Sequence, residues 1–272
     1  MNAIRPERPI RYLKIAKRIV PLAFLIYLLP KVMLAYFVCG ILDVRRNSDR
    51  SLETLNRYFF GNGVLTWLLS PINLLLDVVS IPFRNWGIYQ LDDLPEDYRN
   101  EIAEVMEVAD QAAFIELLER QMENRKRLML FFKWYGVNNP SFTSVPEFHR
   151  PTKFIRTIGV SAFNGRQSTS RHFGPLRATL RVLYNVGPTP QGDSYIEVGR
   201  HVNHWRDQRL FIFDDTLQHQ SVNEAEGIRY CMFIDILRPS KAPWLLSLFV
   251  SSVRICLSRS RAVFYKNWDI AK

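Results

Sequence analysis

The feature that most constrains the fold of this chain is a series of short apolar runs between residues 153 and 237. Each run holds five to eleven residues, is rich in β-branched and aromatic side chains, and is followed within two residues by Gly, Pro, Asn or Asp. Closely spaced short runs separated by turn residues are typical of the antiparallel strands of a sandwich or barrel. We therefore predict a mainly β fold for this part of the chain. The runs are 153–163, 177–186, 194–198, 201–205, 209–213 and 228–237.

A different pattern precedes these strands. Residues 97–132 repeat apolar side chains at helical spacing and carry a charged face, which predicts one long helix or two shorter ones. We expect this part of the chain to be a helical support for the β core. The three cysteines are too few and too scattered for a disulfide framework or a zinc cluster.

Two apolar segments lie near the N-terminus. Segment 18–42 is long enough to cross a bilayer, which takes about 20 apolar residues. Pro30 and Lys31 interrupt it, so it either spans with a kink or enters as a re-entrant or interfacial helix. Segment 63–83 contains Asp77, and it is either an interfacial helix pair or a packed core segment.

The C-terminal segment 243–266 combines Trp and Leu with three arginines. It is typical of an amphipathic membrane-surface helix, and the alternative is a terminal helix that packs on the domain. The net charge is +10, but residues 1–60 carry +7, residues 238–272 carry +6, and the residues between them carry −3. Basic ends beside apolar segments suit an anionic membrane surface and not a nucleic-acid groove. We divide the chain into four regions: membrane-associated 1–90, helical 91–149, β core 150–240 and basic amphipathic 241–272.

Two of the five histidines lie beside expected strand ends. His172 comes before the run 177–186, and His219 follows the run that ends at Phe213. A jelly roll brings distant strand ends together at its mouth, so two histidines 47 positions apart could bind one metal ion. Non-haem Fe(II) sites are built in this way, from two histidines and a carboxylate. The alternative is a pair of unrelated histidines in turns.

Two arginines fall within expected strands. Arg229 lies in the last core run, where a buried guanidinium is unfavourable unless an anion accompanies it. The guanidinium matches both oxygens of a carboxylate, such as the one that 2-oxoglutarate carries at one end. Arg181 is a second strand arginine that could face the same cavity. The alternative for either arginine is an internal ion pair with Asp214, Asp215 or Asp235.

Two blocks of sequence resemble a known family. Segments 171–186 and 205–239, the latter with Phe-Asp-Asp, His, Asn, Arg, Asp and Arg-Pro in order, are similar to the aspartyl/asparaginyl β-hydroxylases. These enzymes are Fe(II)/2-oxoglutarate oxygenases. The resemblance covers residues 150–240, and it implies a double-stranded β-helix core, a jelly roll of the cupin kind, that uses Fe(II), 2-oxoglutarate and O₂.

The resemblance also implies roles for five residues. His172 and His219 would be the iron ligands, and Arg229 would bind the far carboxylate of 2-oxoglutarate. Ser161 falls where family members place a cosubstrate-binding serine, and Arg181 matches a family arginine on the strand after the first histidine.

Two positions depart from the family pattern. Many members carry a histidine two positions after the arginine that Arg181 matches, and here that position is Leu183. The usual iron triad takes an acid two positions after the first histidine, and here that position is Gly174. Glycine at this place also occurs in the peptide-hydroxylating branch of the family. The resemblance therefore implies two histidine ligands without an acid at 174, and we interpret Asp214 and Asp215 as turn-forming or supporting residues.

The plan of the whole chain resembles bacterial membrane enzymes that hydroxylate lipid acyl chains, namely lipid A 2-hydroxylases and ornithine-lipid hydroxylases. The shared features are the apolar N-terminus, the stretches 130–136 and 193–207, and a basic C-terminal tail. The plan implies a dioxygenase at the bacterial inner membrane, with the catalytic domain facing the cytoplasm and a lipid acyl chain or head group as substrate. The alternatives are a peptide aspartyl/asparaginyl β-hydroxylase and a catalytically inactive membrane adaptor with the same fold.

Overall fold

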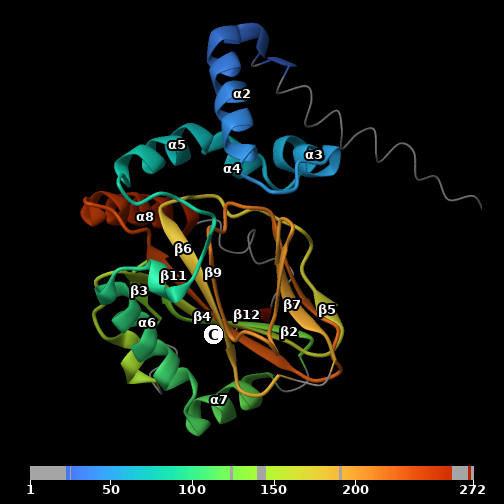
Figure 1. Ribbon diagram of the computed structural model, residues 1–272, viewed down its shortest axis with the longest axis vertical. Helices are drawn as coiled ribbons and strands as arrows, with labels where there is room; N and C mark the ends of the chain where they lie inside the picture. The colour runs from blue at the N-terminus through green and yellow to red at the C-terminus, as the bar shows by residue number, and fades with distance from the viewer. Residues whose placement is uncertain are drawn as a thin grey trace, which may run out of the picture.

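The computed structural model describes residues 23–24, 26–122, 125–139, 145–189, 192–258 and 269–270. Within this part of the chain, strands β4 to β11 wind back and forth between two antiparallel sheets (Figure 1). One sheet contains the order β9–β6–β11–β4, and the other has the order β5–β10–β7–β8. This winding is that of a double-stranded β-helix, so the predicted mainly β jelly-roll fold is confirmed. The strands are β4 (Ile155–Phe163), β5 (Gln167–Ser168), β6 (Thr179–Val186), β7 (Ser194–Val198), β8 (His201–His204), β9 (Leu210–Phe213), β10 (His219–Asn223) and β11 (Arg229–Leu237).

Strand β11 lies in the middle of the first sheet, with β4 on one side and β6 on the other. Its residues are buried throughout because the sheet is covered on both faces. Met232 and Ile234 point to the outer apolar cluster, whereas Cys231 and Phe233 point to the apolar cluster between the two sheets. This alternation is the period of two that a strand imposes on its side chains.

Two helices, α6 (Glu96–Ala109) and α7 (Ala112–Met122), cover the outer face of the first sheet. Ile102 of α6 and Leu118 of α7 are fully buried in the outer cluster, together with Met232 of β11. The helices therefore bury one apolar face of the sheet, and the second sheet buries the other.

The prediction of helix over residues 97–132 is wrong at its C-terminal end. Residues Arg127–Trp134 form strand β2, which pairs antiparallel with β4. Leu130 joins the outer cluster and Phe131 joins the cluster between the sheets, so β2 is apolar on both faces. A run that is apolar at almost every position shows no period by which a strand can be told from a helix. The same sheet also contains β1 (Ile88–Tyr89), β3 (Val137–Asn138) and β12 (Asp269–Ile270).

A layer of helices lies at one end of the barrel. Figure 1 shows α2 projecting away from the barrel along the long axis of the molecule, with α3, α4 and α5 around its base and α8 close to α5. Segment 63–83 folds mainly as the helix pair α4 and α5. Among the described residues, no helix is long and apolar enough to span a membrane. The helices are α2 (Pro30–Val44), α3 (Leu52–Phe60), α4 (Val64–Leu68), α5 (Ser70–Val79) and α8 (Pro243–Ser258), with 3-10 turns at Leu91–Asp93 and Pro146–His149.

Two of the segments predicted to be membrane-associated include residues that the structure does not describe. The first residues of segment 18–42 and the last residues of segment 243–266 lie outside the described residues. The described part of each segment is helical except near Leu29.

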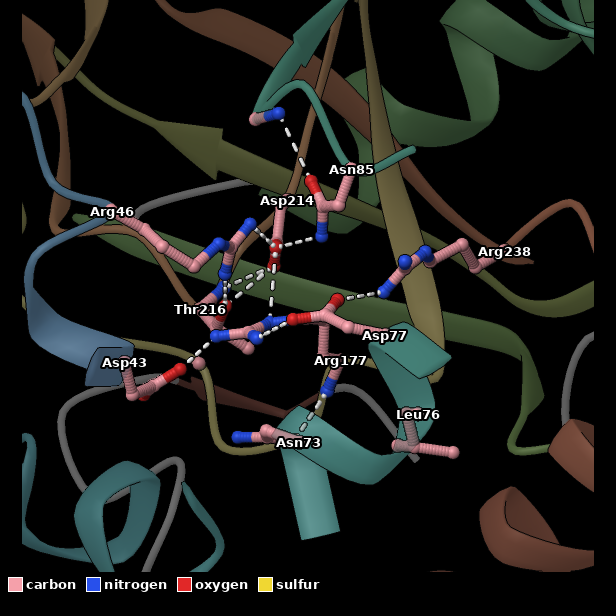
Figure 2. A network of polar contacts seen from close by, with 12 residues as sticks. Asp43, Arg46, Asn73, Leu76, Asp77, Asn85, Arg177, Asp214, Thr216 and Arg238 are labelled. Atoms are coloured by element: carbon pink, nitrogen blue, oxygen red, sulfur yellow. Dashed lines mark hydrogen bonds and ion pairs between the residues drawn. The ribbon is translucent and has the colours of Figure 1, made fainter. Parts of the chain in front are cut away.

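A buried ion-pair network joins the helical layer to the barrel (Figure 2). Arg177, in the loop before β6, pairs with both Asp43 of α2 and Asp77 of α5. Its Nε lies 3.5 Å from Oδ2 of Asp214, which follows β9, and the same oxygen lies 2.6 Å from Nη2 of Arg46. Arg177 and Asp214 are fully buried. Opposite charges that alternate in this way compensate one another's desolvation, so the network holds the helices against the loops that lead into β6 and β10.

Candidate metal centre and cosubstrate pocket

Two histidines meet where the loop before β6 passes the start of β10. His172 N donates to His219 O and His219 N donates to His172 O, each at 2.9 Å, and the ring centroids lie 4.1 Å apart. Strand pairing explains the meeting: β5 pairs with β10, and the chain after β5 stays beside β10, with Thr169 N donating to Ser221 O at 2.9 Å. The fold thus joins two residues that are 47 positions apart in the sequence.

Both histidine rings are held in one tautomer. Nδ1 of His172 lies 2.8 Å from Ser170 O, and Nδ1 of His219 lies 2.8 Å from Leu217 O. A carbonyl oxygen only accepts hydrogen bonds, so Nδ1 carries the proton in each ring and Nε2 keeps its lone pair. Burial lowers the pKa of both imidazoles, and the neighbouring ring of His172 lowers the pKa of His219 further. Two neutral imidazoles with Nε2 lone pairs are donors that Fe(II) and similar divalent ions take, so these residues fit a metal ion.

Gly174 stands where the usual iron triad carries an acid, and Asp215 fills the space beside it. A Cβ atom added to Gly174 would lie 2.4 Å from Cγ of Asp215 and 2.5 Å from each of its carboxyl oxygens. An acid at 174 is therefore excluded while Asp215 keeps its position. Among the described residues, no three His, Cys, Asp or Glu side chains are grouped as a metal site. Asp215 thus lines the same pocket as the histidine pair, and among the described residues the three do not form a metal-binding group.

Arg181 holds the carboxyl group of Asp215. Its Nη2 lies 3.2 Å from Asp215 Oδ2, and its Nε lies 2.9 Å from Asp235 Oδ1. The internal ion pair considered from the sequence is therefore present for Arg181, with two carboxylates. Burial, with the charges of Asp235 and Asp214, raises the pKa of Asp215 to about 7, although Arg181 opposes the shift. One guanidinium cannot compensate two buried carboxylates fully, so Asp215 takes up a proton near neutral pH.

Arg229 has no such partner. It is 1% exposed at the first position of β11, and its Nη1 donates to Ser221 Oγ at 2.9 Å. Its guanidinium carbon lies 4.8 Å from the ring centroid of Phe163 and 5.9 Å from that of Trp205. Its Nε lacks a hydrogen-bond partner, and no carboxylate of the described residues pairs with it. Burial lowers the pKa of Arg229, so the guanidinium is in surroundings that favour the binding of an anion.

A pocket of about 250 Å³ lies between these groups. Ser221 follows His219 by two positions on β10, so both side chains point to the same side of the strand, and both line the pocket. Ser161 on β4 also lines it, and its hydroxyl donates to Cys231 O at 3.3 Å. Leu183, at the position where many relatives have histidine, adds to a lining that is mainly apolar. Other lining residues are Met129, Trp134, Tyr135, Phe173, Phe213 and Phe233.

The structure therefore gathers the sequence-predicted site residues around one cavity. His172, His219, Ser161 and Arg181 line it directly, whereas Arg229 does not line it but donates a hydrogen bond to Ser221, which does. The remaining histidines are placed elsewhere: His201 is exposed, and His149 and His204 lie away from the pocket.

Sequence reasoning missed Ser221 and the contact between Asp215 and Gly174. Ser221 could have been found, because a residue two positions after His219 on a strand must face the same side. The contact between Asp215 and Gly174 leaves no such signal, because it joins two loops whose approach depends on the packing of the whole barrel.

Comparison with known proteins shows the family to which the chain belongs. The family model for aspartyl/asparaginyl beta-hydroxylases matches residues 96–239, which is more than half of the chain. The chain belongs to this family. A curated relative, the ornithine lipid ester-linked acyl 2-hydroxylase of Rhizobium tropici, is 31% identical over 90 residues. The match covers 33% of this chain and 32% of the relative, so it spans about a third of that relative's length.

Solved structures give weaker likenesses to this β-hydroxylase family member. A 2OG-Fe(II) oxygenase family oxidoreductase from Burkholderia pseudomallei is 12% identical with a TM-score of 0.33, over 48% of this chain and 81% of that one. The protein TT1209 from Thermus thermophilus is 14% identical with a TM-score of 0.26, over 33% of this chain and 79% of that one. The fold assignment rests on the strand order of the two sheets.

Proposed function

We propose that this protein is an Fe(II)/2-oxoglutarate-dependent dioxygenase that hydroxylates a membrane lipid, on an acyl chain or the head group. The observation that carries the proposal is the buried guanidinium of Arg229, which has no carboxylate partner among the described residues. It donates a hydrogen bond to Ser221, which lines the same pocket as the two neutral histidines. A cation in such a place is stabilised by an anionic ligand, and a metal ion at the histidines would hold the other end of that ligand.

Each group of the site has a role in this proposal. His172 and His219 would bind Fe(II) through Nε2, because the bonds to Ser170 O and Leu217 O fix the opposite nitrogen as the donor. Arg229 would bind the far carboxylate of 2-oxoglutarate, with Ser221 orienting the guanidinium. Arg181 would act through Asp215, which it holds beside the histidine pair.

When bound, the iron and 2-oxoglutarate supply the oxidising chemistry: O₂ inserts one oxygen atom into a substrate C–H bond and the other into succinate, with release of CO₂. The chain itself positions the reactants and excludes water. The apolar and aromatic lining of the pocket, which includes Phe173, Leu183 and Phe233, suits a hydrocarbon chain better than a charged peptide. The name of the Rhizobium tropici relative describes acyl hydroxylation of a lipid, and we extend that substrate class to this chain.

The apolar and basic terminal segments support a location at the bacterial inner membrane, with the catalytic domain on the cytoplasmic side. Ser161 lines the pocket while its hydroxyl donates to Cys231 O, and it would contact 2-oxoglutarate from β4, as the resemblance implies. Leu183 removes one polar group that many relatives use, so we expect the cosubstrate to depend more heavily on Arg229.

The test is a hydroxylation assay with the full chain. Membranes that contain the protein are incubated with Fe(II), ascorbate and 2-oxoglutarate, and lipid extracts are analysed by mass spectrometry for species heavier by one oxygen atom. We expect the product with the wild type and not with His172→Ala or His219→Ala. His201→Ala is the matched control, because His201 is exposed and does not line the pocket. Product that persists in the His172 and His219 variants would contradict the assignment, and a hydroxylated peptide in place of a lipid would redirect it.

A further inference from the structure

Helix α5 turns its polar side chains toward the protein and its apolar side chains outward. On the inner side, Asn73 Oδ1 accepts a hydrogen bond from Arg177 N at 2.9 Å, and Asp77 pairs with the Arg177 guanidinium. On the outer side, Leu75 is exposed and Val78 is 62% exposed. A helix whose outer face is in water normally shows the opposite arrangement. The outer face of α5 is therefore suited to apolar surroundings.

Helices α2 and α8 also expose apolar faces. In α2, Asp43 is buried in the ion-pair network, whereas Leu34 is 65% exposed. In α8, Leu246 packs beneath the helix, whereas Trp244 is exposed and Leu248 is 58% exposed on the other side. A helix that is apolar on all sides is stable in a protein core or in lipid. The three helices adjoin one another, since α2 packs on α5, and α5 and α8 share an apolar cluster.

The charges on these helices and their flanks match an anionic surface. Lys31 at the start of α2, Lys241 just before α8 and Arg254 within α8 form no ion pair with a carboxylate among the described residues. The acidic residues of the same helices, Asp43 and Asp77, are both ion-paired with buried arginines. Unpaired cations beside exposed apolar side chains are complementary to a bilayer that contains anionic lipids.

The same helical layer holds one wall of the pocket. Thr66 of α4 donates to Gly174 O at 2.9 Å, and Asn73 of α5 donates to Pro175 O at 3.2 Å. Gly174 and Pro175 both line the pocket. Tyr135 packs against the cluster between the sheets and also against the cluster beneath α5 and α8. The pocket is therefore adjacent to the helices whose outer faces are apolar.

We propose that the outer faces of α2, α5 and α8 form one docking surface for an anionic phospholipid bilayer. Docking at this surface brings the pocket wall at Gly174 and Pro175 toward the acyl region, so that an acyl chain passes from the bilayer into the pocket. The docking surface follows from the helices and their charges. The passage of the acyl chain rests in addition on the proposed function.

The docking surface is tested by flotation of the purified full chain with vesicles, without iron or 2-oxoglutarate. The vesicles are phosphatidylcholine alone or phosphatidylcholine with phosphatidylglycerol. We expect Val78→Glu and Leu248→Glu each to weaken partitioning by about tenfold or more, because each places a charge in an apolar contact. Val137→Glu and Val202→Glu are matched controls on β3 and β8, at positions that are 47% and 43% exposed, and they should leave partitioning unchanged. Lys241→Gln should weaken binding about fivefold on the anionic vesicles only.

Several outcomes would overturn the docking surface. One is that Val78→Glu and Leu248→Glu partition onto vesicles as strongly as the wild type. Another is that the controls on β3 and β8 lose as much partitioning as these two variants. A third is a dimer that forms without lipid and that Val78→Glu dissociates, which would show that a second copy covers the face. Thermal melting of each variant establishes that the exposed substitutions leave the fold intact.

Passage of the acyl chain is tested separately through hydroxylation. Val78→Glu should reduce the hydroxylation of lipid in vesicles and leave that of detergent-dispersed lipid unchanged. An equal loss in both would overturn the passage. His172→Ala should abolish hydroxylation and partition like the wild type, so a failure of the proposed function remains distinguishable from a failure of the docking surface.

Discussion

Replacement of Arg229 by methionine should separate cosubstrate binding from stability. In the protein without 2-oxoglutarate, the change removes a buried cation that has no carboxylate partner, which relieves a desolvation cost of several kcal/mol. It also removes the bond to Ser221 and the contacts with Phe163 and Trp205, together worth about 3 kcal/mol. These terms nearly cancel, so we expect the free energy of unfolding to change by no more than about 1 kcal/mol, or about 2 °C in Tm.

The affinity for 2-oxoglutarate should respond very differently. Removal of one partner of a buried charge pair costs about 2–5 kcal/mol, which corresponds to a loss of about 30-fold to several thousandfold. The assay is calorimetric titration of 2-oxoglutarate into the anaerobic Mn(II)-loaded protein, beside thermal melting of the same samples. Mn(II) affinity should stay at the wild-type value, because the Arg229 guanidinium is held by Ser221 and not by the histidine pair. Unchanged affinity of Arg229→Met for 2-oxoglutarate would refute the assigned role.

Arg181→Met is the informative comparison. It leaves the carboxylates of Asp215 and Asp235 without their shared guanidinium, so it should lower the free energy of unfolding by at least about 2 kcal/mol. The two substitutions should therefore differ: Arg229→Met should weaken the binding of 2-oxoglutarate, and Arg181→Met should lower the free energy of unfolding. Equal effects of the two substitutions on stability would show that Arg229 has a partner of its own.

Three further results are expected. Gly174→Asp should lower Tm by several degrees, because its side chain would overlap the Asp215 carboxyl group. The double variant with Asp215→Ala should recover most of that loss, and thermal melts of the single and double variants measure both effects. The affinity for Co(II) at pH 6 should stay within about threefold of the affinity at pH 7.5, because lowered pKa values keep His172 and His219 neutral. Two histidines with unperturbed pKa values would lose about tenfold in affinity over the same range. Equilibrium dialysis at the two pH values measures the difference. Arg177→Met should cost about 3–5 kcal/mol in urea unfolding, since it leaves the buried carboxylate of Asp43 without an ion-pair partner.

The strands of the barrel could be read from the sequence because each is short, apolar and followed by turn residues. The observed bounds of β4, β6 and β11 differ from the expected runs by two residues or fewer at each end. The error at β2 has a physical cause: Arg127–Trp134 is buried on both faces, and burial on both faces removes the alternation that identifies a strand.

The candidate site, like the fold, could be predicted from the sequence only in part. The meeting of His172 and His219 was predicted from family resemblance and from the way a jelly roll gathers its strand ends, and the structure places the two residues in contact. The need of a strand arginine for an anion was predicted from the cost of burial alone. Which arginine is paired internally could not be predicted, since Arg181 and Arg229 lie on neighbouring strands and differ only in the acids that the fold brings near them.

Two consecutive aspartates connect the helical layer to the histidine pair. Although burial acts to raise it, Arg46 and Arg177 hold the pKa of Asp214 well below its usual range, so this carboxylate is an ionised member of the network that joins the helices to the barrel. The pKa of Asp215 is raised instead, and its carboxyl group faces Gly174 in the pocket. Thr216 donates to Asp214 Oδ1 through both its backbone N–H and its hydroxyl, which makes the connection to His219 a tight turn. Because one peptide bond separates Asp214, which belongs to the ion-pair network, from Asp215, which faces the pocket, the loop after β9 links the helical layer to the strand that begins with His219.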